Sequence, residues 1–366
     1  MTALLTASVS ACSEPEDMSY PEDTTATEAE SASETETTEE KTTEEETTEE
    51  KTTEEETTEE KTTEEKTSEK KDGKGADFSE YITHEAVKPA LWKATDTKTG
   101  NELYLMGTIH IMGDDTLPLP DYVMDVYENC DGVAVEYNVN ELQNDMDQIM
   151  DYYSKMVYQD GSDIKDHISK ESYEAAKKYL EEKNSYMSMM DYYCPGFWIS
   201  NIQSMAFAEI ENLSLSGIDS YFITEADKDG KEVVNIETLD IQASVSLGYS
   251  DKLAEFMLED TLEACKETEL VAESVAELYN LWAKGDVDGM LKLEEEDEIP
   301  DELKKDYADY ENISIYERNK GMAEKASEYI KDGKNYFFMV GALHFSGDKG
   351  VDDLLEDMGY KVERVK

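Results

Sequence analysis

Histidine, cysteine and basic residues are all scarce in this chain of 366 residues. It contains 4 His and 4 Cys, and 33 Lys and Arg stand against 89 Asp and Glu, which gives a net charge of -56. A surface of this sign repels phosphates, so we expect no nucleic-acid partner and favour a cationic partner over an anionic one. After Cys12 only three cysteines remain, an odd number, which indicates neither a disulfide framework nor a cysteine zinc site.

Long apolar runs are missing too. No run reaches 18 residues, so we expect no membrane-spanning helix. Instead, residues 13–77 carry 26 acids and 7 lysines with almost no large apolar residue, and include the five-residue period of "KTTEEETTEEKTTEEETTEEKTTEEK". Such a segment cannot bury enough surface to offset its ordering entropy, so it is predicted to be a disordered tether. Of the net charge, -37 remains on the rest of the chain.

The residues ahead of the tether, "MTALLTASVSAC", suggest why a tether is present. Val9 to Cys12 resembles a lipobox, the processing site whose cysteine is lipidated in bacterial lipoproteins. Only eleven residues precede Cys12 and none is Lys or Arg, which is short and uncharged for a signal, so an ordinary N-terminus is the alternative. We expect residues 1–12 to be a lipoprotein signal. The chain would then lie on the extracellular face of a bacterial cytoplasmic membrane and touch the membrane only through its lipid.

The part from about Phe78 to Lys366 is long enough for one large domain, and its pattern is mixed. A hairpin, two short apolar strands and a strongly apolar strand are separated by helical patterns. A helical block rich in Tyr and Met covers about 140–216, and a second helical block covers about 250–330. The predicted strands are Leu91–Thr95, Glu102–Met106, "DGVAVEYN" with Glu136, "KEVVNIET" with Glu237, and Tyr336–Val340.

Two turns in this part repeat each other. "GTIHIMGDD" and "GALHFSGDK" share the pattern Gly-x-x-His-x-x-Gly-Asp and contain His110 and His344. Each follows an apolar strand and precedes a helix and a further strand, which indicates an internal βαβ repeat. The prediction is an α/β fold. Its mostly parallel sheet consists of two related strand-GxxH-helix-strand halves, with a large helical lobe inserted.

The repeat predicts a shared site, because functional groups in parallel sheets gather at the C-terminal ends of the strands. By that rule His110, Glu136, Glu237 and His344 emerge at one edge. They could hold a divalent metal and leave a position open for water, or act without metal as a histidine base oriented by a carboxylate. A third interpretation makes the histidines satisfied polar caps in a duplicated turn. His84 and His167 lie in polar contexts and are predicted to be ordinary solvated residues.

Several further segments carry a family resemblance over about Ala90 to Lys366. With the paired turns, "GIDSYF", "IET" followed by Gln242, "YNLWAKGD", "ERNKGMAEK" and "FFMVGALHFSGDKGVDDLLEDMGYKV" resemble the TraB/GumN family, related to the TIKI Wnt-inactivating metalloproteases. The resemblance implies an α/β core of two related halves with a helical lobe. For the TIKI branch it also implies a metal-dependent peptidase.

Carried onto this sequence, the resemblance implies a divalent ion (Mn, Co or Zn) held by His110, His344 and Glu136. Either Glu136 or Glu237 would activate a water molecule, with Glu136 preferred. Arg318 could stabilise a developing oxyanion, with an exposed helix arginine as the alternative. Three more residues are expected to support the site or bind substrate: Gly107, Gly341 and Asn319.

The expected function is therefore a surface-anchored, metal-dependent hydrolase, a peptidase acting on a peptide or protein. One alternative is a non-enzymatic lipoprotein that binds metal or haem. Another is a metal-independent, esterase-like hydrolase, since the wider superfamily contains both kinds of protein. A degenerate member serving as an interaction module is a further alternative.

Overall fold

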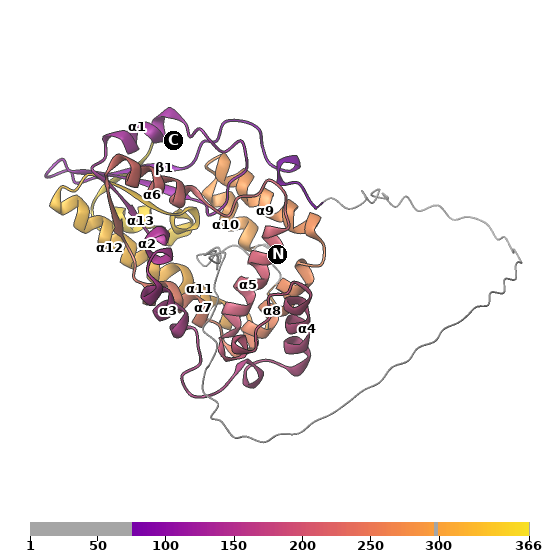
Figure 1. Ribbon diagram of the computed structural model, residues 1–366. Helices are drawn as coiled ribbons and strands as arrows, with labels where there is room; N and C mark the ends of the chain where they lie inside the picture. Colours follow the sequence, from indigo (N-terminus) through magenta and orange to yellow (C-terminus); the bar gives the residue numbers. More distant parts are fainter. Residues whose placement is uncertain (1–74, 296–298, 366) are drawn as a thin grey trace, which may run out of the picture. The chain divides into compact units, whose positions relative to one another are not determined.

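The computed structural model of the chain describes residues 75–295 and 299–365 (Figure 1). Cys12 and the predicted tether up to residue 74 lie outside these ranges. The tether was predicted to extend to residue 77, but Ala76 is buried and its carbonyl accepts a hydrogen bond from the Glu211 amide at 2.8 Å. The Phe78 amide donates in turn to the Glu211 carbonyl at 2.9 Å, so the packed region begins before Phe78.

Six strands of the described chain form one sheet in the order β4-β3-β5-β2-β1-β6. Strands β2, β3, β4 and β5 are parallel, and β1 is antiparallel to both of its neighbours, β2 and β6. Five strands therefore run in the same direction, which confirms the predicted mostly parallel sheet. Their bounds are Leu91–Thr95 (β1), Glu102–Thr108 (β2), Gly132–Val135 (β3), Glu232–Asn235 (β4), Tyr336–Gly341 (β5) and Lys361–Arg364 (β6).

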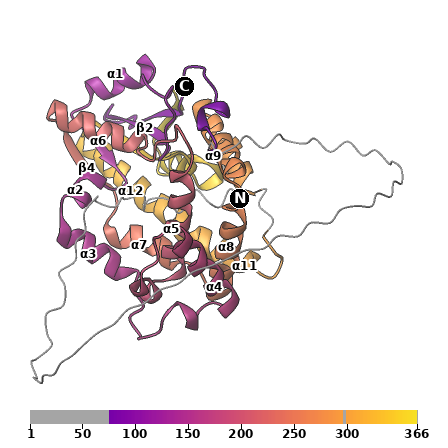
Figure 2. The ribbon, with the colours of Figure 1, turned by 45° about the vertical axis from the view of Figure 1, so that its right-hand side comes forward.

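Helices cover both faces of this sheet. The evidence is that adjacent residues of a central strand contact different helices. Phe337 of β5 packs on Phe222 of α6 (Ile218–Asp229), and Tyr336 packs on Tyr329 of α12 (Glu317–Asp332). Consecutive strand residues point to opposite faces, so α6 and α12 lie on opposite sides. The helix α1 (Asp121–Asn129) joins α6 through Tyr127, and α13 (Val351–Asp357) packs beside α12 (Figures 1 and 2). Helices on both faces explain why β3 and β5 are continuous apolar runs.

The connections create a switch point between β2 and β5. From β2 the chain crosses through α1 to β3, and from the adjacent β5 it crosses through α13 to β6 in the opposite direction. A reversal of strand order leaves a crevice outside the carboxyl ends of the two strands. His110 follows β2 and His344 follows β5, so the two related halves bring both histidines to this crevice.

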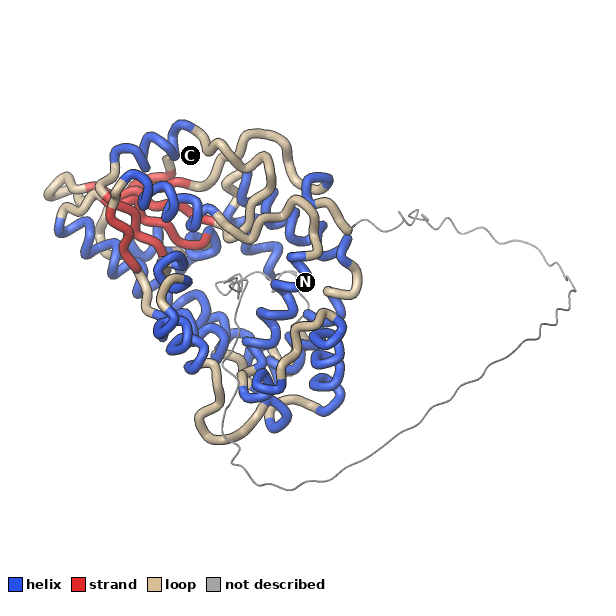
Figure 3. Tube along the Cα trace, viewed as in Figure 1, coloured by secondary structure: helices blue, strands red, loops and turns tan. Residues whose placement is uncertain are grey.

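Most of the remaining helices form a lobe, which lies beside the strands in Figure 3. The lobe has its own core around Trp198, Leu253 and Tyr310, separate from the core around the sheet. The segment α7 (Leu239–Leu247), for which the sequence analysis predicted neither helix nor strand, is a helix that begins after Thr238, whose side chain accepts a hydrogen bond from the Ile241 amide. The lobe helices are α2 (Val139–Gln143), α3 (Met146–Lys155), α4 (Lys170–Glu182), α5 (Pro195–Ala208), α7 (Leu239–Leu247), α8 (Asp251–Ala264) and α11 (Lys304–Glu311).

One detail differs from the sequence prediction, because the helical block at 250–330 does not belong wholly to the lobe. Trp282 of α9 (Thr268–Ala283) and Met290 of α10 (Val287–Glu295) belong to the core around the sheet, as does Met322 of α12. These helices therefore reach the switch point. In the described part of the chain, no helix is both long enough and apolar enough to cross a bilayer.

Candidate functional site

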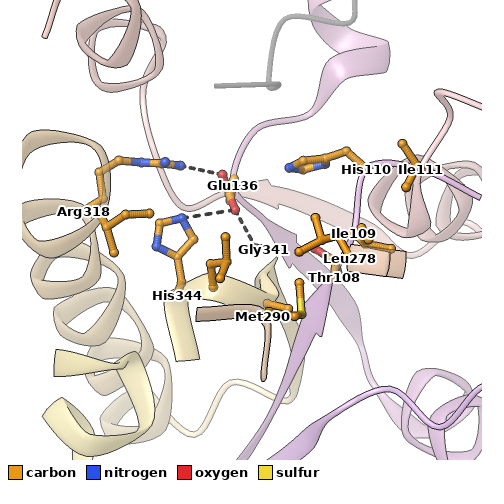
Figure 4. Close-up of a pocket in the computed structure, with 13 residues that line it drawn as sticks. Thr108, Ile109, His110, Ile111, Glu136, Leu278, Met290, Arg318, Gly341 and His344 are labelled. Carbon is orange, nitrogen blue, oxygen red and sulfur yellow. Dashed lines mark hydrogen bonds and ion pairs between the residues drawn. The ribbon is translucent and has the colours of Figure 1, made fainter. Parts of the chain in front are cut away.

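A pocket of about 60 Å³ lies at the switch point. Four of its side chains carry the chemistry predicted from the sequence, namely His110, Glu136, Arg318 and His344, and Figure 4 shows the two imidazoles on either side of Glu136. The other lining residues are Thr108, Ile109, Ile111, Leu278, Met290, Ile315, Gly341, Ala342 and Leu343.

His344 is held as a neutral ring of one tautomer. It is 4% exposed in the turn η7 (Ala342–Phe345), with its Nδ1 2.5 Å from Asn319 Oδ1. The Asn319 amide nitrogen donates to the Lys349 carbonyl at 2.8 Å, which fixes the amide oxygen towards the histidine. Nδ1 must therefore carry the proton, and Nε2 presents a lone pair. Burial and the nearby Arg318 guanidinium lower the pKa of His344 to about 3.

Glu136 faces that lone pair. It follows β3, is 5% exposed, and its Oε1 lies 3.7 Å from His344 Nε2 while accepting from the Gly341 amide at 2.7 Å. Burial acts to raise the pKa of Glu136, but Arg318 and the two histidines outweigh it and lower that pKa to about 2. Two acceptors, Nε2 and Oε1, thus point at each other. A cation or a water molecule between them would satisfy both.

Arg318 is buried, so the interpretation as an exposed helix arginine is wrong. Its Nη2 donates to Glu136 Oε2 at 2.5 Å and to Glu237 Oε2 at 2.9 Å. Its Nε donates to Glu237 at 2.9 Å and its Nη1 to the Ser314 carbonyl at 3.0 Å, so four of its five N–H groups have protein partners. This geometry suits the positioning of carboxylates better than the binding of an oxyanion.

Glu237 does not line the pocket, and it supports the site through its contact with Arg318. Both of its oxygens accept from Arg318, and one also accepts from Gln242. Burial raises the pKa of Glu237, with Arg318 acting against it. Of the two glutamates predicted to be catalytic, only Glu136 reaches the pocket.

His110 is held by a residue that the sequence analysis did not assign. Its Nδ1 lies 3.1 Å from Asp219 Oδ2, in the first turn of α6, and Thr108 donates to the other oxygen of Asp219 at 2.8 Å. Burial acts to lower the pKa of His110, but Asp219 outweighs it and raises that pKa to about 9. A Cβ on Gly217 would lie 2.3 Å from His110 Cα, so this glycine lets α6 approach the turn. The quoted "GIDSYF" contains Asp219 and was the available signal.

The glycines of the two GxxH turns permit close contacts. A Cβ on Gly107 would lie 3.0 Å from Ala342 Cα, where the second turn packs on the first. A Cβ on Gly341 would lie 3.3 Å from Glu136 Oε1. Gly107 thus lets the backbones of the two turns pack together, whereas the contact at Gly341 is only a tight one with the end of a side chain.

The fit of a divalent ion can be tested on these residues. Each imidazole has a side-chain oxygen beside its Nδ1, which leaves Nε2 as the ligand atom, as in most metal-binding histidines. His344 presents this nitrogen unprotonated, whereas His110, whose pKa is raised to about 9, would bind an ion only after losing its Nε2 proton. Glu136 Oε1 adds a carboxylate oxygen of the kind that Zn or Mn accepts. Within residues 75–295 and 299–365, however, no three His, Cys, Asp or Glu side chains are grouped closely enough to hold an ion. The donors fit in type, and the described conformation does not gather three of them at one point.

The remaining histidines lie outside the pocket. His84 is exposed and has its Nδ1 2.7 Å from Asp115. His167 stacks on Tyr158 and has its Nδ1 2.9 Å from Asp251. They provide natural controls for the pair in the site.

The fold and site together define a doubly wound α/β protein with paired GxxH turns and a buried Glu–Arg–Glu cluster at its switch point. The chain belongs to the TraB/PrgY/gumN family, whose model matches residues 90–364.

The chain is also distantly related to animal metalloproteases. It is 24% identical over 185 residues to the metalloprotease TIKI2 of Danio rerio, which covers 45% of this chain and 35% of that protein. Metalloprotease TIKI1 of Homo sapiens is 22% identical over 182 residues, covering 45% and 36% respectively. The TIKI homologue of Nematostella vectensis is 24% identical over 185 residues, covering 45% and 39%. The matched region thus spans little more than a third of these relatives, and no solved structure matches the chain.

Proposed function

We propose that the chain is a metal-dependent hydrolase of peptide bonds, with its ion held by His110, His344 and Glu136. The observation that carries the proposal is the pair of facing acceptors, His344 Nε2 and Glu136 Oε1, 3.7 Å apart in a pocket that His110 also lines. The printed names of the TIKI relatives, which call them metalloproteases, support the same class.

In this reaction the oxygen of water bonds to the carbonyl carbon, the C–N bond breaks, and a proton from the water passes to the leaving nitrogen. A divalent ion would polarise the carbonyl and lower the pKa of a water molecule towards about 7. Glu136 is the carboxylate in the pocket, so the transfer of the proton falls to it rather than to Glu237. Arg318 fixes Glu136 through Oε2, and Asn319 and Asp219 orient the imidazoles.

The test uses the full-length chain, stripped of metal and reloaded with Mn, Co or Zn, with cleavage of a peptide library followed by mass spectrometry. We expect His110→Ala and His344→Gln each to lose at least about 100-fold in kcat/KM, as expected when a ligand or proton-transfer group is removed. His84→Ala and His167→Ala are the matched controls and should cleave as the wild type does. Wild-type rates in both site variants would overturn the proposal.

A metal-independent hydrolase is the second candidate, and one observation favours it. The described residues do not group three potential ligands, while neutral His344 already presents an unprotonated Nε2 as a base. Retention of activity after exhaustive chelation would select this candidate. Loss on chelation and recovery with one added ion would select the first.

The expected location is likewise a proposal, supported only by the sequence around Cys12. We propose that a lipid on Cys12 anchors the chain to the outer face of a bacterial cytoplasmic membrane and that the acidic tether extends the domain from it. Replacement of Cys12 by Ala should move the protein from the membrane fraction to the soluble fraction. An unchanged distribution would refute the anchor.

A further inference from the structure

The pocket has an apolar side that the proposed chemistry does not use. Six aliphatic side chains form it, and they come from the first GxxH turn, α9, α10, the π-helical turn η6 (Asn312–Tyr316) and the second GxxH turn. They are Ile109, Ile111, Leu278, Met290, Ile315 and Leu343. An apolar pocket wall beside a few convergent polar groups is the usual form of a substrate site.

This apolar wall is fixed in place relative to the histidines. Trp282 of α9 donates its indole N–H to the Gly107 carbonyl at 3.0 Å, which ties α9 to the first GxxH turn. Leu278 and Met290, on α9 and the following α10, are 3% and 2% exposed and pack in the same core as that turn. Such buried, well-packed side chains form a preformed surface rather than a loop that must order.

The outer part of the wall depends on the π-helical turn. This turn directs the Ser314 carbonyl to Arg318 at 3.0 Å and places Ile315 in the pocket. Ile315 is partly exposed, unlike Leu278 and Met290. A π-helical turn often marks a functional position because it redirects side chains locally.

The charges of the pocket favour one kind of substrate side chain against this apolar wall. Its charged lining groups, His110, Glu136 and Arg318, have protein partners, and the remaining lining residues are neutral. A charged substrate side chain placed against the six aliphatic residues would lose its hydration without gaining a counter-charge. An aliphatic side chain would instead gain from the removal of its surface from water.

We propose that this wall is a specificity subsite for an aliphatic side chain, of the size of Leu, Ile, Val or Met, next to the scissile bond of a polypeptide substrate. The inference rests on the proposed hydrolase function and names its substrate class. The folded part carries a net charge of -37, so basic residues further along the substrate would assist its approach.

The experiment compares peptides that differ at one position, with Leu, Ala or Asp there and Lys residues at both ends. We expect kcat/KM for the Leu peptide to exceed that for the Asp peptide by about 100-fold, and that for the Ala peptide by about 10-fold or more. Met290→Phe, which fills the wall, and Ile315→Ala, at the pocket mouth, should each reduce the Leu-to-Ala ratio at least about 3-fold. This ratio does not depend on the fraction of folded enzyme.

Met257→Ala is the matched control, since Met257 is equally buried but lies in the core of the helical lobe. It should leave the Leu-to-Ala ratio of kcat/KM unchanged.

The same peptides are also titrated against the chain by calorimetry. Hydrolysis without a preference for Leu, or with a preference that neither pocket variant changes, would overturn the subsite and leave the proposed function standing. Selective binding of the Leu peptide without hydrolysis would support the subsite and count against the hydrolase, and neither binding nor hydrolysis would overturn both.

Discussion

Removal of the Arg318 guanidinium should destabilise the fold strongly, because two buried carboxylates share it. Glu136 and Glu237 are 5% and 6% exposed, and both accept from the same Nη2, at 2.5 and 2.9 Å. Arg318→Met keeps a side chain of similar reach but leaves two buried carboxylates side by side. When one partner of a buried ion pair is removed, the loss is about 3–5 kcal/mol, and we expect the free energy of unfolding to fall by that amount at neutral pH.

The assay is urea unfolding followed by circular dichroism and tryptophan fluorescence, on full-length protein. Lys320→Ala removes a cation from the same helix, but its partner Glu317 is exposed, so the change should stay within about 0.5 kcal/mol. The double variant with Arg318→Met and Glu237→Gln leaves one buried charge instead of two. It should recover about 1 kcal/mol or more of the loss, as expected for residues in direct contact.

The reasoning would be refuted if Arg318→Met cost no more than Lys320→Ala. It would also be refuted if the added Glu237→Gln change lowered stability further by its full single-variant amount. Either result would mean that the cluster is not held together by the shared guanidinium.

The other predictions concern the histidine supports and one half-buried carboxylate. Gly217→Ala places a Cβ against the His110 backbone and should reduce hydrolysis at least about 10-fold, measured as kcat/KM, because the backbone that carries the ring must shift. Asn319→Leu removes the acceptor for His344 Nδ1–H and should weaken metal binding about 10- to 100-fold in a competition titration. Burial raises the pKa of Asp352 from 3.8 to about 6, so its folded form binds a proton more tightly and stability falls as pH rises through 6. Asp352→Asn should therefore raise the free energy of unfolding by about 1–2 kcal/mol at pH 8 and leave it unchanged at pH 3, as measured by urea titration.

Each of these has a matched control in the chain. Gly321→Ala lies in α12 where a Cβ would meet nothing, so it should leave activity unchanged and stabilise the helix slightly. Asn201→Leu removes an amide that bonds only the Phe197 carbonyl within its own helix and should leave metal affinity unchanged. Asp357→Asn, on the exposed side of α13, should not reproduce the pH-dependent gain. Equal effects in a control and its partner would contradict the corresponding explanation.

The strands and the paired turns could be predicted because their signals are local. "LYLM" and "YFFMV" are apolar runs of strand length, and the recurrence of Gly-x-x-His at their ends needs no tertiary information. The rule for parallel sheets then places His110, Glu136 and His344 at one edge. The structure puts all three on one pocket, although their catalytic and ligand roles stay predictions.

The partners of these residues were harder to predict, because they come from other elements. Asp219 reaches His110 across more than a hundred residues, and its place in the family-like segment "GIDSYF" is the signal that the sequence offers for it. Arg318 has the charged neighbours Glu317 and Lys320, which suggest an exposed helix face, but the helical period is the better guide. Arg318 lies one turn from Met322, on the buried face of α12.

The measurement that tests the central claim most directly is the metal content of the full-length chain by mass spectrometry, after incubation with Mn, Co or Zn and removal of excess ion. The account predicts about one ion per chain in the wild type, loss of that ion in both His110→Ala and His344→Gln, and its retention in His84→Ala and His167→Ala. Loss in both site variants would place the two GxxH turns at one centre. An ion retained at full occupancy in either site variant, or no ion in the wild type, would contradict the claim.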